Sequence, residues 1–178
     1  MAAEAGLLGG DRRLREVSEE VGRRAEQLIH DAEVDAADWV PVTAGSAELL
    51  EACRATGRSV AVYAPHSESA VGRYLHRLGM RSLVGPALGR GFAMRNPAVR
   101  TLAPVFEAIG VRAQDTAVVC ATFSAMSATQ RAGGMRSGWS GFGNRGRCCT
   151  AGRANAVVRS LTALAEAVQE CGPPPEVW

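Results

Sequence analysis

The chain has 178 residues, of which 47% are hydrophobic and 21% are charged, a composition typical of one globular domain and not of a disordered segment. Its formal net charge of +2 is too small to indicate a nucleic-acid-binding protein. All 20 basic residues are arginines. The absence of lysine excludes a lysine Schiff base and a Walker-type P-loop.

The cysteines and the apolar runs give no sign of secretion, metal binding or membrane insertion. The five cysteines include no CxxC pair, so neither a disulfide framework nor a zinc site is indicated. No apolar run reaches 18 residues, and the first residues lack a signal-peptide pattern. We therefore expect a reduced, soluble, cytoplasmic protein that has no membrane contact and needs no metal or cofactor.

The spacing of apolar residues predicts helices that alternate with strands. From Asp11, apolar residues recur every three or four positions (Leu14, Val17, Val21, Ala25, Leu28, Ala32) and predict a helix that ends before Pro41. Further helices are predicted at 46–56, 67–78, 101–109, 123–132 and 160–168, and strands at 59–64, 82–84, 116–120 and 156–158. Such alternation is typical of an α/β fold, a Rossmann-like parallel sheet with helices on both faces.

Functional groups in such sheets collect in the loops that follow the carboxyl ends of the strands. Here those loops are residues 64–69, 91–97, 120–126 and the glycine-rich 133–149. The polar and aromatic residues in them are the candidate ligand-binding residues: His66, Ser67, Arg95, Asn96, Cys120, Thr122 and Trp139.

Each candidate also has a purely structural interpretation. Ser67 begins a helix whose N–H groups could bind an anion, but ordinary N-capping is favoured. Cys120 follows a strand and could be a reactive thiolate, although most such cysteines are small buried apolar residues. His66 is the only ionisable ring beside a predicted strand end, and a surface or capping role is commoner than a catalytic one. No catalytic residue is therefore assigned.

Residues 131–153 combine arginines with aromatic residues. The segment contains Arg131, Arg136, Arg145, Arg147 and Arg153 together with Trp139 and Phe142. Arginine interleaved with aromatic residues can bind a single nucleic-acid strand. The arginine density is nevertheless close to the average of the chain, so a solvated loop is favoured and nucleic-acid binding is not expected.

The order of these segments resembles the haloacid dehalogenase (HAD) superfamily, specifically phosphoglycolate-phosphatase-like hydrolases of actinobacterial type. The resemblance covers about residues 22–168. It is carried by AGSAELLEACRATGRSVAVY, SAVGRYLHRLGM, LVGPALGR, the NP before a helix ending in AIGV, the AVVC strand with a helix ending in RAGG, and AVVRSLTALAEAV. It implies a helical cap remnant at 1–42 and a HAD-like α/β core at 43–170. The sequence CGPPPEVW predicts an extended tail at 171–178.

The chemistry that this resemblance implies needs an Asp nucleophile with a second Asp, a Ser or Thr, a Lys and a pair of carboxylates for Mg²⁺, because phosphoryl transfer depends on positioning and charge neutralisation. Ala64 stands at the Ser/Thr position and Asn96 at the Lys position, while Ala121 and Ala125 replace the carboxylates. The nearest Asp pair, in Asp35–Asp38, has the wrong spacing and lies in a helical pattern. We therefore do not expect a metal-dependent aspartyl phosphatase.

The resemblance also implies that the central strand of the family lies outside the matched residues. We expect the gap to be closed, filled by residues near Trp39–Val42, or filled by a homo-oligomer or a protein partner. Two functions remain open. One is a catalytically inactive HAD-like protein that acts by binding, as a scaffold, accessory subunit or regulator. The other is a repurposed enzyme or small-molecule binder in secondary metabolism with an apolar, metal-free pocket.

Overall fold

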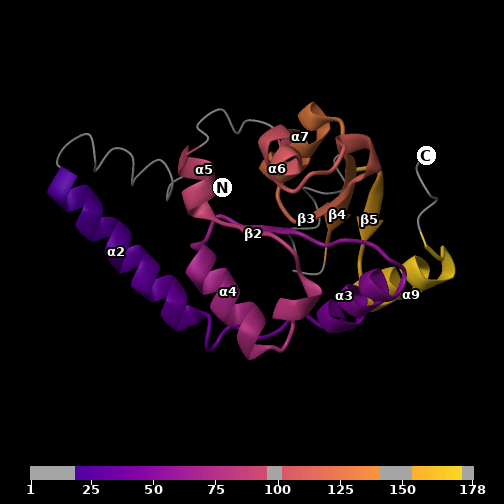
Figure 1. The fold of residues 1–178 in the computed structure, drawn as a ribbon, viewed down its shortest axis with the longest axis horizontal. Helices are drawn as coiled ribbons and strands as arrows, with labels where there is room; N and C mark the ends of the chain where they lie inside the picture. Colours follow the sequence, from indigo (N-terminus) through magenta and orange to yellow (C-terminus); the bar gives the residue numbers. More distant parts are fainter. Residues whose placement is uncertain (1–18, 96–101, 141–153, 174–178) are drawn as a thin grey trace.

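The computed structural model describes residues 19–95, 102–140 and 154–173. Helices and strands alternate through them (Figure 1), as the sequence predicts. The helices are α2 (Glu19–Ala36), α3 (Ser46–Ala55), α4 (Glu68–Arg77), α5 (Arg90–Arg95), α6 (Ala103–Ala108), α7 (Phe123–Ala132) and α9 (Leu161–Glu170). The strands are β1 (Val62–Tyr63), β2 (Ala87–Leu88), β3 (Ala117–Cys120), β4 (Met135–Trp139) and β5 (Ala156–Val158), and 3₁₀ turns lie at Arg81–Leu83 and Ala113–Asp115.

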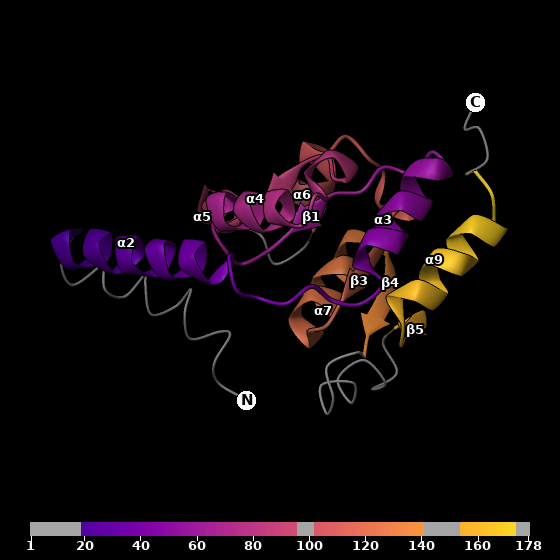
Figure 2. The ribbon, with the colours of Figure 1, turned by 90° about the horizontal axis from the view of Figure 1, so that it is seen from below.

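All strand pairs among the described residues are parallel, which confirms the predicted fold class. The strands nevertheless form two separate sheets, β1–β2 and β3–β4–β5. Val62 is opposite Ala87 in the first sheet, and Val118 is opposite Arg136 in the second. Figure 2 shows α7 on one side of the larger sheet and α3 with α9 on the other. Within the described residues, β1 and β3 are therefore each an edge strand.

The contact of α3 with α9 and a buried cluster on α6 connect segments that are far apart in the sequence. Helix α3 packs against α9, and Gly45, the residue before α3, lies against the start of α9. A Cβ atom at Gly45 would lie 2.4 Å from the backbone nitrogen of Thr162, and the Gly45 φ of +83° also favours glycine. Helix α6 supplies a buried cluster of Val105 and Phe106 with the preceding Leu102. Residues from both sheets, Leu88 and Val118, pack against this cluster.

Helix α2 is held against α4 by arginines near the end of α4. Arg73 forms a two-bond ion pair with Asp38, 2.7 Å from Nε to Oδ1. Arg77 donates to the carbonyl oxygens of Ala37 at 2.8 Å and Val40 at 2.6 Å. The hydrogen bonds from Arg73 hold the pKa of Asp38 below its usual value. Figures 1 and 2 both show α2 projecting beyond the rest of the described chain, so this contact is one of those that fix its direction.

The strand predicted at 82–84 is wrong. Residues Arg81–Leu83 form a 3₁₀ turn, and the strand that pairs with β1 comes later, at β2. The physical reason lies in Val84, which is buried in a cluster with Leu75 and Met80. Because Val84 is buried in this cluster, the chain comes alongside the segment that leads into β1 only at Gly85, whose N–H donates to the Val60 carbonyl.

Two elements formed where loops were predicted. Residues 133–149 were expected to be a glycine-rich loop, but their first part is the middle strand β4. Small residues suit this position, since Ser137 and Gly138 are buried and a Cβ at Gly134 would lie 3.1 Å from the Phe106 ring. Helix α5 likewise occupies part of the loop predicted before the helix at 101–109. Residues Trp39–Val42 form no strand.

Helix ends follow the predicted signals. Gly79 has a φ of +68° directly after α4, and Pro104 lies in the first turn of α6, as expected. No helix within the described residues is long and apolar enough to cross a membrane. Cys148, Cys149, Asn96, residues 1–18 with the start of the helix predicted from Asp11, and the last five residues of the predicted tail lie outside the described residues.

Candidate functional site

The β1–α4 junction is the most polar strand end in the described chain. Strand β1 is followed by Ala64, Pro65 and His66, and Ser67 then begins α4. The Ser67 side chain accepts a hydrogen bond from the Ala70 N–H at 3.3 Å. Ser67 is thus the N-cap of α4, the interpretation that the sequence favoured.

The carboxylate of Glu33, on α2, lies at this junction. It accepts hydrogen bonds from the Ser67 N–H at 2.8 Å and from the Arg90 guanidinium at 2.5 Å. The His66 Nδ1 lies 3.4 Å from the same carboxylate. Glu33 and Arg90 have side chains only 15% and 12% exposed, whereas His66 is mostly exposed. The anion at the start of α4 is therefore the Glu33 carboxylate of the chain itself.

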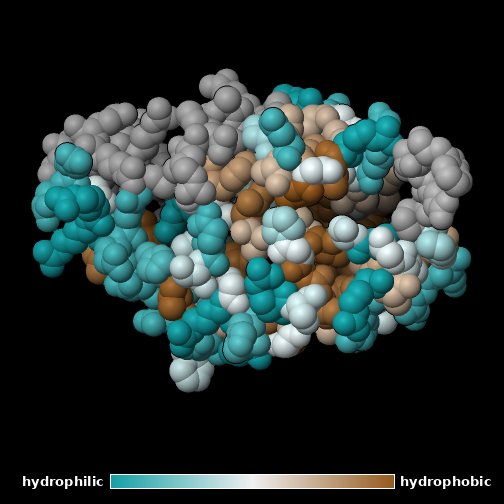
Figure 3. All heavy atoms as spheres, viewed as in Figure 1, coloured by the Kyte–Doolittle hydropathy of each residue, from teal (hydrophilic) through white to brown (hydrophobic). Residues whose placement is uncertain are grey.

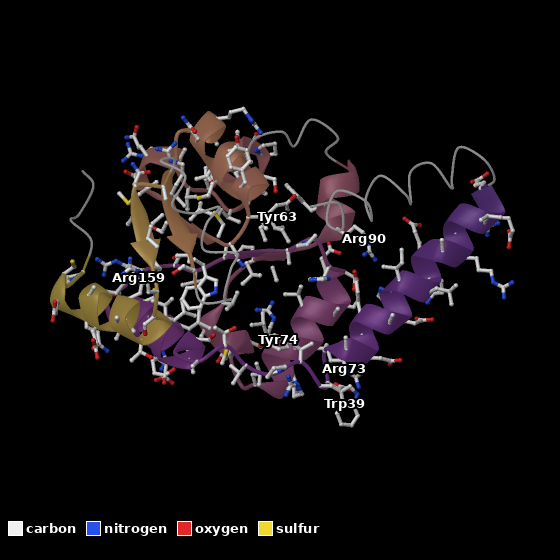
Figure 4. The ribbon with its side chains drawn as sticks, turned by 180° about the vertical axis from the view of Figure 1, so that it is seen from behind. Trp39, Tyr63, Arg73, Tyr74, Arg90 and Arg159 are labelled. Carbon is white, nitrogen blue, oxygen red and sulfur yellow. The ribbon has the colours of Figure 1, made fainter. Side chains whose placement is uncertain are left out.

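The charge of Glu33 is stabilised at this position. Burial alone would raise the pKa of Glu33, but the hydrogen bonds from Ser67, Arg90 and His66 outweigh it. The pKa of Glu33 is consequently lowered, and the carboxylate is ionised at neutral pH. Figure 4 shows Arg90 reaching from the start of α5 toward this junction.

Close packing of the β2–α5 turn positions Arg90. Its N–H donates to the His66 carbonyl at 2.7 Å, and the Glu68 carboxylate accepts from the N–H groups of Gly89 and Phe92 at 3.3 and 3.2 Å. A Cβ at Gly89 would lie 2.5 Å from the His66 carbonyl oxygen. Glycine is therefore needed here for the close approach of two backbones.

A groove of about 530 Å³ lies between α2 and this junction. Most of its lining residues are charged or polar: Arg23, Glu26, Gln27, His30, Ser67, Glu68, Arg90 and Gly91. This differs from the apolar pocket that the second functional hypothesis expected. The difference arises because α2 turns a polar face toward α4.

The second strand end, after β3, carries few groups that could do chemistry. Thr122 is the N-cap of α7 and accepts from the Ala125 N–H at 3.2 Å, and its hydroxyl lies 3.2 Å from that of Ser124. Cys120, at the end of β3, is half-buried and forms no disulfide with the other described cysteines. Trp139 ends the neighbouring strand β4 and is half-buried. Across 19–95, 102–140 and 154–173, no three His, Cys, Asp or Glu residues are placed to bind a metal ion.

The structure brings some of the predicted residues together and places others elsewhere. His66 and Ser67 share the Glu33 carboxylate on the smaller sheet, whereas Cys120 and Thr122 lie at the end of β3 in the larger sheet. The backbone of Arg95 belongs to α5, while its side chain and Asn96 lie outside the described residues. The ligand-binding roles of all seven residues remain predictions.

Sequence analysis missed Glu33 and Arg90. Arg90 directly follows a glycine after an apolar pair, which is a signal for a strand end. Glu33 is one of several acidic residues on a long helix, and the contact spans 34 residues to Ser67. No local pattern distinguishes it from its neighbours.

Solved structures with the same arrangement of elements decide the fold. A β-phosphoglucomutase from Clostridium difficile matches with a TM-score of 0.68 and 20% identity over 92% of this chain and 75% of that protein. A dehalogenase matches with a TM-score of 0.61 and 16% identity, over 84% of this chain. A HAD family hydrolase from Deinococcus radiodurans R1, solved with bound phosphate and sodium, matches with a TM-score of 0.60 and 19% identity over 91% of this chain and 74% of that protein.

The protein has a HAD-like fold. The chain spans 62% of the length of the dehalogenase, and identities of this size show the fold and not the activity. Neither a protein-family model nor a curated protein sequence matches the chain.

Proposed function

We propose that this HAD-like protein acts by binding an extended segment of another protein along β1 and β3, and that it does not hydrolyse phosphate esters. The observation that carries the proposal is the exposure of apolar side chains on these two strands. Tyr63 on β1 is 39% exposed, and Val119 on β3 is 41% exposed. Each strand is an edge within the described residues.

Exposure of this kind is unusual for strands of a parallel α/β sheet, which are normally covered on both faces. The sequences VAVY and AVVC are apolar, as covered strands require, yet Tyr63 on β1 and Ala117 and Val119 on β3 are exposed. Figure 3 shows hydrophobic residues gathered across the middle of one face, between the α2–α4 end and the β5–α9 end. A contiguous apolar surface is typical of an interaction site.

The backbone at these edges is also available for pairing. The N–H groups of Val62 and Ala64 donate to the carbonyl oxygens of Pro86 and Leu88, so the polar groups of the intervening Tyr63 point away from β2. In the larger sheet, the Thr116 carbonyl accepts a hydrogen bond from the Met135 N–H of β4. Every second residue after Thr116 therefore faces β4, and the N–H of Val119 points away from it. Unpaired edges of this kind bind extended peptides by adding a strand.

The absence of phosphatase activity is supported by the residues at the two strand ends. Ala64 follows β1, and Ala121 and Ala125 follow β3, so none of these positions offers a carboxylate or a hydroxyl. At the start of α4, the Ser67 N–H and the Arg90 guanidinium are already bonded to Glu33. A phosphate ester would have to displace this carboxylate before it reached either group.

A binding experiment with matched variants tests the proposal. Full-length protein purified gently from its own host is analysed by native mass spectrometry, and the partner is identified by cross-linking from position 63. The cross-linked peptide should be an extended apolar segment. Val119→Pro, which removes the edge N–H, should weaken binding of the purified partner at least tenfold more than Val119→Ala, which shortens the side chain and keeps the N–H. Equal binding by both variants would refute strand addition.

A turnover assay tests the other half of the proposal. With Mg²⁺ and p-nitrophenyl phosphate, the protein should show no hydrolysis above that of a heat-denatured sample. Hydrolysis that co-purifies with the protein and is lost in Arg90→Ala would refute the proposed inactivity.

The groove beside Glu33 favours a second function, binding of a small polar molecule. Its volume of about 530 Å³ is within the range of ligand sites. In this case native mass spectrometry of the gently purified protein should show a discrete small-molecule mass that disappears in Arg90→Ala and persists in Val119→Pro. A partner protein without such a mass would exclude this alternative.

A further inference from the structure

Helix α2 has an apolar stripe that faces solvent. The residues Val21, Ala25, Leu28, Ala32, Ala36 and Trp39 recur every three or four positions and so lie on one side of the helix and its last turn. Val21 is 48% exposed, Leu28 63% and Trp39 84%. In Figure 4, Trp39 points away from the rest of the protein, beyond the end of α2. We refer to these six residues as the α2 stripe.

The stripe is outward because α2 binds the rest of the protein through its opposite, polar side. Glu33 bonds to Ser67 and Arg90, and Asp38 bonds to Arg73 after the helix ends. His30 and Arg23 also line the groove toward α4. An amphipathic helix normally buries its apolar stripe and exposes its polar side. On α2 this orientation is reversed, so the apolar stripe is exposed and the polar side contacts the rest of the protein.

Charges beside the stripe favour one occupant over others. Arg24, Asp31 and Asp35 are separated by seven and four residues, so they lie along one flank of the stripe, and all three are exposed. The basic residue is near the start of the helix and the two acidic residues are near its end. Two such helices in antiparallel orientation bring the same flank of each together, which places Arg24 beside Asp35 of the other copy. The two Asp31 residues then lie near each other at the two-fold axis, so one repulsive contact accompanies two attractive ones.

We infer that the α2 stripe is a self-association surface, on which α2 of a second copy packs in antiparallel orientation. In a dimer with two-fold symmetry the contact is repeated, so each charge pair forms twice. The symmetric pairing also places Trp39 of one copy against Val21 of the other, and Leu28 near Ala32. A large exposed aromatic at such a contact is typical of residues that dominate interface energy. In parallel orientation, the Arg24 flank would instead meet the uncharged flank that carries Ile29.

Sedimentation of the full chain over about 1 to 200 µM tests the inference. The wild type should be a dimer that dissociates on dilution, and Leu28→Asp should be a monomer across the range because it buries a charge in the stripe. Met135→Asp changes a similarly exposed apolar residue outside α2 and should remain a dimer. A monomeric wild type, or a Leu28→Asp dimer, overturns the inference.

Charge reversal tests the orientation without touching the apolar residues. Arg24→Glu and Asp35→Arg should each weaken the dimer about tenfold, because each brings like charges together twice. An equimolar mixture of the two variants should regain wild-type affinity. In the mixed dimer the glutamate introduced at position 24 faces the arginine introduced at position 35, and the second contact keeps the native pair of Arg24 and Asp35. Failure of the mixture to regain affinity overturns the antiparallel arrangement. Circular dichroism of each variant confirms that it is folded.

These variants leave β1 and β3 unchanged, so the inference can fail independently of the proposed function. Leu28→Asp should still bind a partner at the strand edges. Val119→Pro should still form the α2 dimer. A variant that loses both interactions together would show that one surface serves both.

Discussion

Replacement of Glu33 by alanine removes the group that connects α2 to the β1–α4 junction. The substitution deletes the acceptor for the Ser67 N–H and the only carboxylate bonded to the Arg90 guanidinium among the described residues. Because the Arg90 side chain is only 12% exposed, its charge would be left without a partner and with little water. Both losses act in the folded state, so the free energy of unfolding should fall.

The size of the effect follows from the exposure of the pair. Breaking a fully buried ion pair costs about 3–5 kcal/mol, and hydrogen bonds to charged groups contribute about 1.5–3 kcal/mol each. The pair here keeps some contact with water, so we expect Glu33→Ala to cost about 2–3 kcal/mol. This corresponds to a Tm decrease of roughly 4–12 °C for a chain of this size. Glu33→Gln keeps an acceptor oxygen and should cost about half as much.

Urea denaturation followed by circular dichroism measures the effect. Glu51→Ala, which removes an exposed carboxylate on α3, is the matched control and should cost less than about 0.5 kcal/mol. A cost for Glu33→Ala no larger than that of Glu51→Ala would refute the argument. It would show that the Glu33 contact contributes nothing beyond a surface ion pair.

The same pair predicts a pH dependence. The pKa of Glu33 is lowered in the folded protein relative to its usual value of 4.5, so the ionised carboxylate stabilises the fold above that pH. This contribution is lost as the pH falls through the lowered pKa. The stability difference between the wild type and Glu33→Gln should therefore be constant from about pH 6 to 8 and shrink below about pH 4.5. A difference that grows on acidification would contradict the assigned charge state.

Other substitutions test the packing. Gly45→Ala should cost at least about 3 kcal/mol in the free energy of unfolding, because its Cβ would overlap α9, whereas Gly57→Ala has equal backbone strain but open space and should cost about 1 kcal/mol. Met126→Ala removes a fully buried side chain and should cost about 2–5 kcal/mol, against less than about 1 kcal/mol for the exposed Met135→Ala. Ser67→Ala should cost about 1 kcal/mol through the lost N-cap. Urea denaturation measures all five, and equal costs within either matched pair would contradict the packing described.

The sequence correctly predicted features that depend on residues a few positions apart, such as helix caps. Ser67 caps α4 as expected, because an N-cap is formed between residues three apart. Thr122 caps α7 in the same way, although the sequence analysis gave it only as a candidate ligand-binding residue. The predicted strand at 82–84 failed because burial of Val84 outweighed strand propensity. Strand β4 was missed because Ser137 and Gly138 are small residues without strand propensity, and they are buried by contacts that the sequence does not display.

The candidate site was predictable only in part. The strand ends that bear His66 and Cys120 were identified from alternation alone, since their position follows from topology. The carboxylate that occupies the first strand end was not, because Glu33 reaches it from another helix. Spacing on α2 did predict the apolar stripe of Val21 and Leu28, but spacing cannot say which side of a helix the protein covers.

The contact at Glu33 also bears on the α2 stripe. Because α2 projects from the rest of the described chain, its orientation depends on Glu33 near its C-terminal end and on the Asp38–Arg73 pair just beyond it. Loss of the Glu33 contact should let α2 rotate or detach. The α2 stripe would then no longer be held in the orientation that a second copy binds. Glu33→Ala should therefore weaken the dimer as well as the fold, whereas Glu51→Ala should not. Sedimentation under conditions where Glu33→Ala is still folded measures this, and an unchanged dimer would show that the stripe is presented without help from the junction.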